Sequence, residues 1–142
     1  MNDAKTFLRE IRSERQEIRI LDSKIMEKRY ELLPGAIRYD TDKVQASPQD
    51  NMSIIFAEID KYEKALKKHM TRLQKRQKKA ADMISRIPSS EQRQVMELYY
   101  MSPVNPTWDD VADELSYSRR AVLNYHGDAL CWLNEHIVFL NK

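Results

Sequence analysis

Glycine is nearly absent from this chain of 142 residues, which contains only 2. Glycine-rich loops that cradle nucleotide phosphates are therefore excluded. The single cysteine, Cys131, cannot form an internal disulfide, and its apolar neighbours predict a small side chain packed in the core. No apolar run approaches the ~18 residues that span a bilayer, and no signal-peptide pattern is present, so we expect a reducing cytoplasm and no membrane contact.

Charge is what the chain has in abundance, because 32% of its residues are Asp, Glu, Lys or Arg. Together with the scarcity of glycine and of strand-like alternation, this composition predicts an all-α fold. The net charge of +2 conceals a division: residues 1–87 hold 20 Lys and Arg against 14 Asp and Glu, whereas residues 88–142 hold 4 against 8. The second part is acidic, which is unfavourable for strong autonomous binding to DNA phosphates.

Two N-terminal segments carry apolar stripes with alternating steps of three and four residues. The first stripe is Phe7, Ile11, Glu14, Ile18, Leu21, Ile25, Lys28 and Leu32, and the second is Ile55, Ile59, Tyr62, Leu66, His69, Leu73, Arg76, Ala80, Met83 and Ile87. Helices of about 45 and 55 Å could not bury these stripes inside a globule. We expect an antiparallel coiled-coil hairpin over 1–87, with a loop at about 34–50, that pairs with a second copy. A parallel dimer without the hairpin is the alternative.

A second domain is expected at 88–142. Pro88 interrupts the long helix, and Ser89 with Gln92 forms a plausible capping box for a helix over 91–101. The last helix is expected to continue to about Phe139, with Ile137, Val138 and Leu140 packed on the hairpin or on Trp108. This domain is therefore also helical.

A helix-turn-helix pattern lies within the second domain. Thr107 is suited to cap a first helix with an apolar face, and Ser118 is suited to cap a second one. A close crossing of the two helices needs a small residue at Ala112 and an apolar residue at Val122. Between them, Ser116 occupies the turn position where glycine most easily adopts a left-handed conformation. An ordinary helical hairpin with the same apolar stripe is the alternative.

The polar face of the second helix predicts the DNA contacts. The residues expected to face the major groove are Arg119, Arg120, Leu123 and Asn124. Arg side chains suit guanine edges or phosphates, and Asn suits an adenine edge. The hydroxyls of Thr107 and Ser118, or the helix N-terminal amides beside them, would hold phosphates.

A basic face on the second long helix offers another contact with nucleic acid. Its residues, all opposite Leu66 and Leu73, are Lys64, Lys67, Lys68, Arg72, Lys75, Lys78 and Lys79. The simpler interpretation is a solvated helical face. The functional one is a row of phosphate contacts that compensates for the acidic second domain.

An enzyme is not expected. His69, His126 and His136 are dispersed, and with Cys131 they show no zinc-binding spacing. His126 is expected to pack beside the DNA-facing surface or to contact phosphate. No cofactor and no metal are predicted.

The C-terminal segments EQRQVMELYY, TWDDVADEL and SYSRRAVLNYHGDAL resemble region 4, the DNA-binding domain, of bacterial sigma-70-type factors. The whole chain, including DKVQASPQDNM at 42–52, is similar to late-gene transcription regulators of the ArpU and RinA type from Firmicute phages and prophages. In sigma factors the start of the second helix reads the promoter, a role that the resemblance assigns to Arg119, Arg120, Leu123 and Asn124. Leu123 departs from the polar residue of sigma factors, so the promoter preference does not transfer.

The resemblance implies a transcription regulator of phage or prophage genes in the cytoplasm of a bacterial host. Double-stranded DNA would be its partner, with RNA polymerase as a further one and a homo-oligomer as its state. A phage small terminase subunit is one alternative, which a ring stoichiometry would favour. A protein-binding adaptor that docks on RNA polymerase without contacting DNA is another, and the acidic charge suits it.

Overall fold

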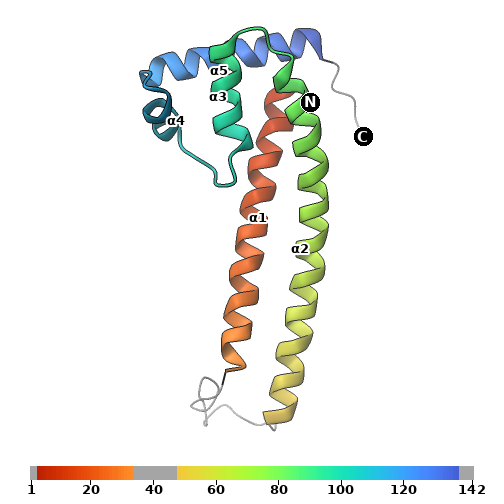
Figure 1. The fold of residues 1–142 in the computed structure, drawn as a ribbon. Coiled ribbons are helices and arrows are strands. Elements are labelled where there is room, and N and C mark those ends of the chain that lie inside the picture. The colour runs from red at the N-terminus through yellow and green to blue at the C-terminus, as the bar shows by residue number, and fades with distance from the viewer. Residues whose placement is uncertain (1–2, 34–47, 138–142) are drawn as a thin grey trace. The chain divides into compact units, whose positions relative to one another are not determined.

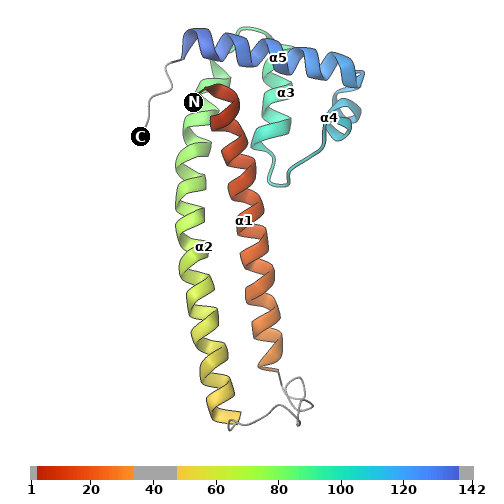
Figure 2. The ribbon, with the colours of Figure 1, turned by 180° about the vertical axis from the view of Figure 1, so that it is seen from behind.

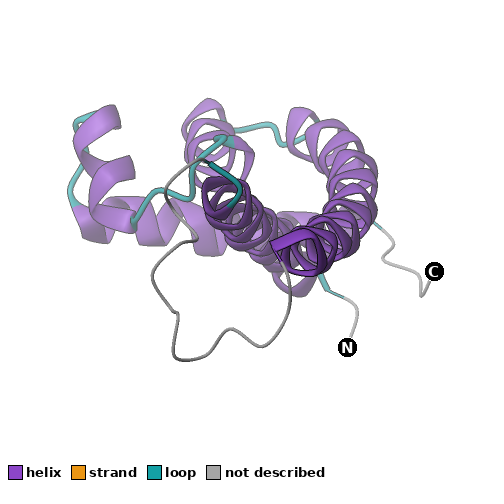
Figure 3. Ribbon diagram, turned by 90° about the horizontal axis from the view of Figure 1, so that it is seen from below, coloured by secondary structure: helices purple, strands orange, loops and turns teal. Residues whose placement is uncertain are grey.

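The computed structural model describes residues 3–33 and 48–137, and within them every regular element is a helix (Figure 3). The helices are α1 (Ala4–Glu31), α2 (Pro48–Ser85), α3 (Ser90–Met101), α4 (Trp108–Leu115) and α5 (Arg119–His136). The all-α prediction is therefore confirmed for this part of the chain. None of these helices combines the length and apolar character needed to cross a membrane.

The observed helix ends differ from the predicted ones, most clearly at the start of α2 and at the end of α5. The structure begins α2 at Pro48, so residues 48–50 are helical and not part of the predicted loop at 34–50. Proline is favourable in the first turn, because the amide that it lacks would have no acceptor there. The last helix ends at His136 and not near Phe139. The rest of the predicted loop, together with Val138 and Leu140, lies outside the described residues.

The chain divides into two compact units, each of which contains parts of α1 and α2. The smaller unit is Glu17–Thr71, where the two helices run side by side in opposite directions (Figures 1 and 2). Ile25 from α1 and Ile55 and Ile59 from α2 form its buried cluster. Salt bridges across the pair join Lys28 to Glu58 and Arg29 to Glu63. The two apolar stripes thus contact each other within one chain.

The larger unit consists of Met1–Gln16 and Arg72–Lys142. Its main buried cluster takes residues from four helices and from the connection after α2: Ala4, Leu8 and Ile11 of α1, Ala80, Met83 and Ile84 of α2, Ile87 of the connection, Met96 and Tyr100 of α3, and Ala129 and Leu133 of α5. Ile137 is half-buried against the same cluster, as predicted. The start of α1 and the end of α2 therefore share a core with the C-terminal helices.

This division differs from the predicted boundary at residue 88. Met96, Tyr100, Ala129 and Leu133 would lose much of their buried environment without the two long helices, because these helices supply the other side of the cluster. A boundary between independently folding domains at residue 88 stays a prediction. The two compact units are divided within α1, after Gln16, and within α2, after Thr71, and not at the end of α2.

Polar residues within the apolar stripes are paired. Glu14 is buried, and its carboxylate lies 3.9 Å from the Arg76 guanidinium, which also contacts Glu10 at 3.2 Å. Lys28 lies 3.3 Å from Glu58, and this hydrogen bond raises the pKa of Lys28. Such pairs fix the register of two helices, because a shift of one turn would leave the charges unpaired.

Candidate nucleic-acid interface

The α4–α5 pair is shaped by caps that the sequence predicted. Thr107 Oγ accepts a hydrogen bond from the Asp110 amide at 3.1 Å, and the Asp110 carboxylate accepts one from the Thr107 amide at 2.9 Å. The latter contact lowers the pKa of Asp110. Ser118 Oγ accepts from the Ala121 amide at 3.1 Å and opens α5 in the same way. Both start positions are thereby fixed by local hydrogen bonds.

The turn between the helices is only three residues long, because α4 ends at Leu115 and α5 starts at Arg119. Ser116 has φ 59° and ψ 38°, a left-handed conformation, as its predicted position in the turn requires. The Tyr117 amide donates to the Ala112 carbonyl at 3.0 Å, and the Ser116 amide donates to the Asp113 carbonyl at 3.3 Å. This pair of bonds is a Schellman motif, which ends α4 and reverses the chain sharply.

The contact between the two helices is small and apolar. Ala112 and Val122 share a buried cluster with Val111 of α4 and Val95 of α3, and Val122 is fully buried. Ala112 and Val122 are therefore buried in the same cluster. Tight packing at this point holds the start of α5 in a fixed direction relative to α3 and α4.

All six residues predicted to contact DNA through α4 and α5 are exposed. Thr107 and Ser118 lie at the helix starts, and Arg119, Arg120, Leu123 and Asn124 lie in the first turns of α5. Arg119 Nε is 3.7 Å from the Asp109 carboxylate of α4, and both side chains are more than half exposed. That ion pair is weak, since water screens it. The arrangement leaves the first turns of α5 accessible while its opposite side is buried.

The turn before α4 is held by α1, a role that the sequence pattern did not predict. Arg12 donates to the carbonyls of Tyr99 at 2.6 Å and of Pro106 at 2.9 Å. Its guanidinium lies 3.7 Å from the centre of the Tyr99 ring, and the Trp108 ring stacks on Tyr99 with centroids 3.6 Å apart. The Asn105 amide donates to the Arg12 carbonyl at 2.8 Å. Arg12 therefore fixes both sides of the α3–α4 turn.

Arg15, one turn further along α1, is buried but poorly paired. Its Nη1 donates to Asn105 Oδ1 at 3.4 Å, whereas its Nε and Nη2 have no hydrogen-bond partner within the described residues. Burial, with a smaller contribution from the charge of Arg12, lowers the pKa of Arg15 to about 10. The residue thus stays charged at neutral pH. Nothing in the spacing of the sequence distinguishes Arg12 and Arg15 from exposed arginines of the same helix.

His126 packs among buried residues, which is one of the two roles expected for it, and its side chain is not exposed at the surface. Its Nε2 is 2.7 Å from the Tyr100 hydroxyl, and the Trp108 ring lies 4.5 Å away between centroids. Burial, followed by the charge of Lys5, lowers the pKa of His126 to about 4, and burial raises the pKa of Tyr100. His126 follows Val122 by four residues, which places it on the inward stripe.

Cys131 is exposed, so its predicted place in the core was wrong. At 3.6 residues per turn, Cys131 lies about 200° around the helix from the buried Ala129. Apolar neighbours in the sequence therefore misled the prediction, because adjacent residues of a helix point in different directions. Across residues 3–33 and 48–137, no group of three His, Cys, Asp or Glu side chains could hold a metal ion.

The predicted basic face is divided between the two compact units. Lys64, Lys67 and Lys68 belong to Glu17–Thr71, and Arg72, Lys75, Lys78 and Lys79 belong to the larger unit. All seven are exposed. Two of them have local partners, because Lys64 pairs with Asp60 at 2.9 Å and Lys79 Nζ lies 5.1 Å from the centre of the Phe7 ring. Each part is thus a solvated, basic helix surface.

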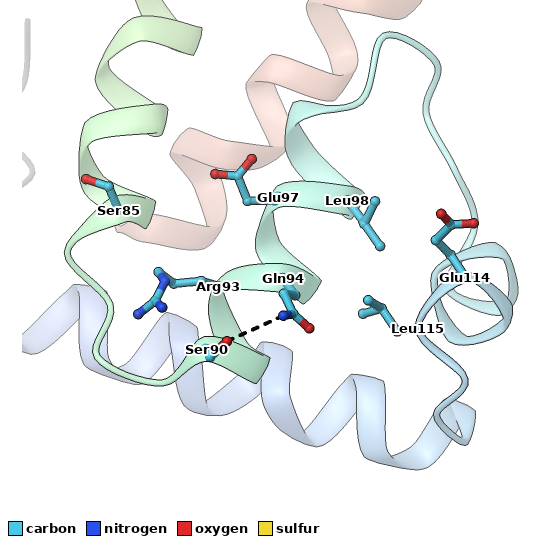
Figure 4. Close-up of a pocket in the computed structure, with 8 residues that line it drawn as sticks. All are labelled: Ser85, Ser90, Arg93, Gln94, Glu97, Leu98, Glu114 and Leu115. Atoms are coloured by element: carbon cyan, nitrogen blue, oxygen red, sulfur yellow. Dashed lines mark hydrogen bonds between the residues drawn. The ribbon is translucent and has the colours of Figure 1, made fainter.

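A second surface feature is a hollow of about 570 Å³ formed by the end of α2, α3 and α4 (Figure 4). Leu98 and Leu115 supply its apolar part, and the carboxylates of Glu97 and Glu114 are also part of its lining. Gln94 donates to Ser90 Oγ at 3.4 Å along its side. The hollow is open to solvent and combines apolar groups with two carboxylates and the guanidinium of Arg93.

Comparisons with known proteins identify no relative. No protein-family model, no curated protein sequence and no solved structure matches this chain.

Proposed function

We propose that this chain is a sequence-specific DNA-binding regulator of transcription, acting on phage or prophage genes, in which α4 and α5 form a helix-turn-helix. The observation that supports this proposal most is the exposed start of α5, fixed by the Ser116 turn and by the Ala112–Val122 crossing. A helix presented in this way is able to enter the major groove of DNA. The resemblance to sigma region 4 and to phage late-gene regulators supplies the biological setting.

The individual contacts follow from chemistry. Arg120 would donate to a guanine edge or a phosphate, and Asn124 would pair with an adenine edge. Thr107 Oγ and Ser118 Oγ each accept an amide hydrogen, so their own O–H groups remain able to donate to phosphates. Arg119 would exchange its exposed ion pair with Asp109 for a DNA phosphate.

We further propose that α1 and α2 form an antiparallel coiled-coil hairpin that pairs with a second copy of the chain. The support is the set of large apolar side chains that stay exposed within Glu17–Thr71: Ile20, Met26, Tyr30, Leu33, Met52, Ile54, Phe56 and Met70. A second copy would cover them. Joining two DNA-binding motifs in one oligomer can raise the affinity ~100-fold or more on spaced half-sites, which offsets the acidic charge of 88–142.

The test is selection of binding sites by the full chain from a pool of random duplexes, followed by affinity measurements on the selected duplex. Arg120→Ala and Asn124→Ala should each weaken binding by ~1–3 kcal/mol, or roughly 5- to 150-fold, and relax the preference at one base pair. Arg19→Ala is the control, because this arginine is exposed on α1 outside the candidate interface. Binding by both variants at the wild-type level would exclude the proposed groove contacts.

A second candidate function is a protein-binding adaptor that docks on RNA polymerase, and the hollow in Figure 4 favours it. Apolar Leu98 and Leu115 beside Glu97 and Glu114 suit a partner segment with apolar and basic side chains. Glu97→Lys with Glu114→Lys should then abolish binding to purified bacterial RNA polymerase and leave binding to the duplex intact. Polymerase binding without any DNA preference of the chain alone would favour the adaptor over the regulator.

A further inference from the structure

A smaller cavity, of about 320 Å³, lies on the larger unit and differs in character from the hollow in Figure 4. The residues that line it come from four helices: Lys5 and Arg9 of α1, Tyr99 and Tyr100 of α3, Trp108 of α4, and Leu123 and His126 of α5. Two of these residues are cations, and none is acidic. Aromatic walls keep water away from part of the cavity, so a charge inside it is less screened than at an open surface.

The two cations have no counterion in the part of the chain that the structure describes. Lys5 and Arg9 are exposed, lie one turn apart on the same face of α1, and form no ion pair with any residue of 3–33 and 48–137. Their charges nevertheless act across the cavity. Lys5 is one cause of the lowered pKa of His126, and Arg9 opposes the rise in the pKa of Tyr100. The cavity is therefore electropositive and suited to an anion.

The cavity lies beside the residues that are candidates for contacting DNA. Leu123, one of the residues expected to face the groove, lines it from α5, and Trp108, which follows the Thr107 cap, lines it from α4. A helix in the major groove, which is about 12 Å wide, has a phosphate backbone on either side. A cation that shares a cavity with a groove-facing residue is thus close enough to reach one of these backbones.

We infer that this cavity binds a phosphate of the DNA backbone, held by Lys5 and Arg9 of α1. The inference rests on the proposed function and adds α1 to the DNA-binding surface. The inference also explains how the protein could bind DNA although residues 88–142 are acidic. The compact unit that contains both α1 and the C-terminal helices has 14 Lys and Arg against 12 Asp and Glu, so the unit that would meet DNA is not acidic overall.

The experiment measures the affinity of the full chain for a mixed-sequence 30-base-pair duplex and for the selected duplex over a range of salt concentrations. Lys5→Gln with Arg9→Gln should weaken binding to both duplexes by roughly tenfold or more. The slope of log affinity against log salt should become shallower by about 0.9 for each phosphate that is no longer neutralised. The base preference should be unchanged, because phosphate contacts do not read sequence.

Two matched variants complete the design. Arg19→Gln with Lys61→Gln removes the same charge from exposed positions of the other compact unit, and it should leave the salt slope unchanged. Lys5→Arg with Arg9→Lys keeps both charges and should keep wild-type affinity and slope. Circular dichroism verifies that each variant is folded, which we expect because neither Lys5 nor Arg9 contributes to the buried core.

The outcomes separate the inference from the function on which it rests. Site-selective binding by the wild type, combined with a Lys5/Arg9 double variant that behaves like the Arg19/Lys61 control, would overturn the inference and leave the regulator proposal standing. Absence of any duplex binding by the wild type would overturn both. Loss of affinity in the charge-keeping variant as well would show that α1 acts through shape and not as a phosphate ligand.

Discussion

Ser116 is the one residue other than glycine with a positive φ in 3–33 and 48–137, and its φ of 59° crowds any side chain larger than hydrogen. Ser116→Gly should therefore stabilise the protein, by up to about 1 kcal/mol. Ser116→Val should destabilise it by more than the glycine gains, since a β-branched side chain fits this conformation worst. Thermal unfolding followed by circular dichroism measures both changes. A glycine variant that melts below the wild type would contradict a strained turn.

The lowered pKa of His126 leads to a prediction of how the free energy of unfolding depends on pH. Its pKa is lowered to about 4 in the folded protein from an ordinary value near 6.5, so the folded state favours the neutral imidazole. The unfolded chain takes up a proton first as the pH falls. The contribution of His126 to the free energy of unfolding is therefore fully present above pH 6.5. It decreases by on the order of 3 kcal/mol as the pH falls toward 4.

The measurement is urea unfolding at several pH values between 7.5 and 4.5, for the wild type and for His126→Phe. The variant loses the hydrogen bond to Tyr100 and should be less stable at pH 7.5. Its stability should fall less steeply with acid than that of the wild type, since the other titrating groups are shared. Parallel curves for the two proteins would show that His126 does not contribute to the pH dependence.

At the scale of elements, α1 is a support for the α3–α4 turn as well as a partner of α2. Arg12 donates to the main-chain carbonyls of Tyr99 in α3 and of Pro106 in the turn, whereas Arg15 is buried with two nitrogens unpaired. Arg12→Met should cost about 2–3 kcal/mol, because two partly buried acceptors lose a charged donor. Arg15→Met should change the stability by less than about 1 kcal/mol or increase it, because the burial of a poorly paired charge is unfavourable.

Chemical denaturation of the two variants tests this contrast. Near-ultraviolet circular dichroism reports the environment of Trp108, which stacks on Tyr99 beside Arg12. The aromatic signal should change in the Arg12 variant and stay close to wild type in the Arg15 variant. Equal losses of stability in both would mean that the two arginines support the turn to the same extent.

At the scale of the whole molecule, the exposed apolar residues of Glu17–Thr71 predict an oligomer. Met26 and Tyr30 are 71% and 67% exposed and lie one turn apart on α1. Met26→Glu with Tyr30→Glu should lower the mass measured by light scattering and leave the helical content intact. Charged groups placed at an apolar contact between chains oppose association, whereas in a monomer they would simply be solvated.

The matched variant is Leu66→Asp, which places a charge beside the buried cluster that joins α1 and α2 within one chain. It should reduce helical content and thermal stability, in contrast to the double glutamate variant. The apolar periodicity of α1 and α2 was also compatible with contacts between chains. In the structure, residues of the two apolar stripes pack on each other within one chain. An unchanged mass for the glutamate variant would exclude this apolar surface as the oligomer contact.

The sequence was sufficient for several features that depend on a few consecutive residues. The capping roles of Thr107 and Ser118 and the left-handed Ser116 are examples, because each is set by hydrogen bonds and backbone conformation within one turn. The Ala112–Val122 crossing was also predictable, since helical periodicity fixes which side chains of two short, connected helices meet. The same periodicity, applied fully, would have placed His126 inward and Cys131 outward.

Only the tertiary structure brought α1 to the C-terminal helices. The contacts of Arg12 with Tyr99 and Pro106 span 87 and 94 positions of the sequence, and no local pattern encodes such a pairing. The same holds for Lys5 and Arg9, which appear in the sequence as ordinary charges of a long helix. Their place in the cavity beside α3, α4 and α5 depends on which surface the start of α1 covers. The shared core of α1, α2, α3 and α5 determines that surface.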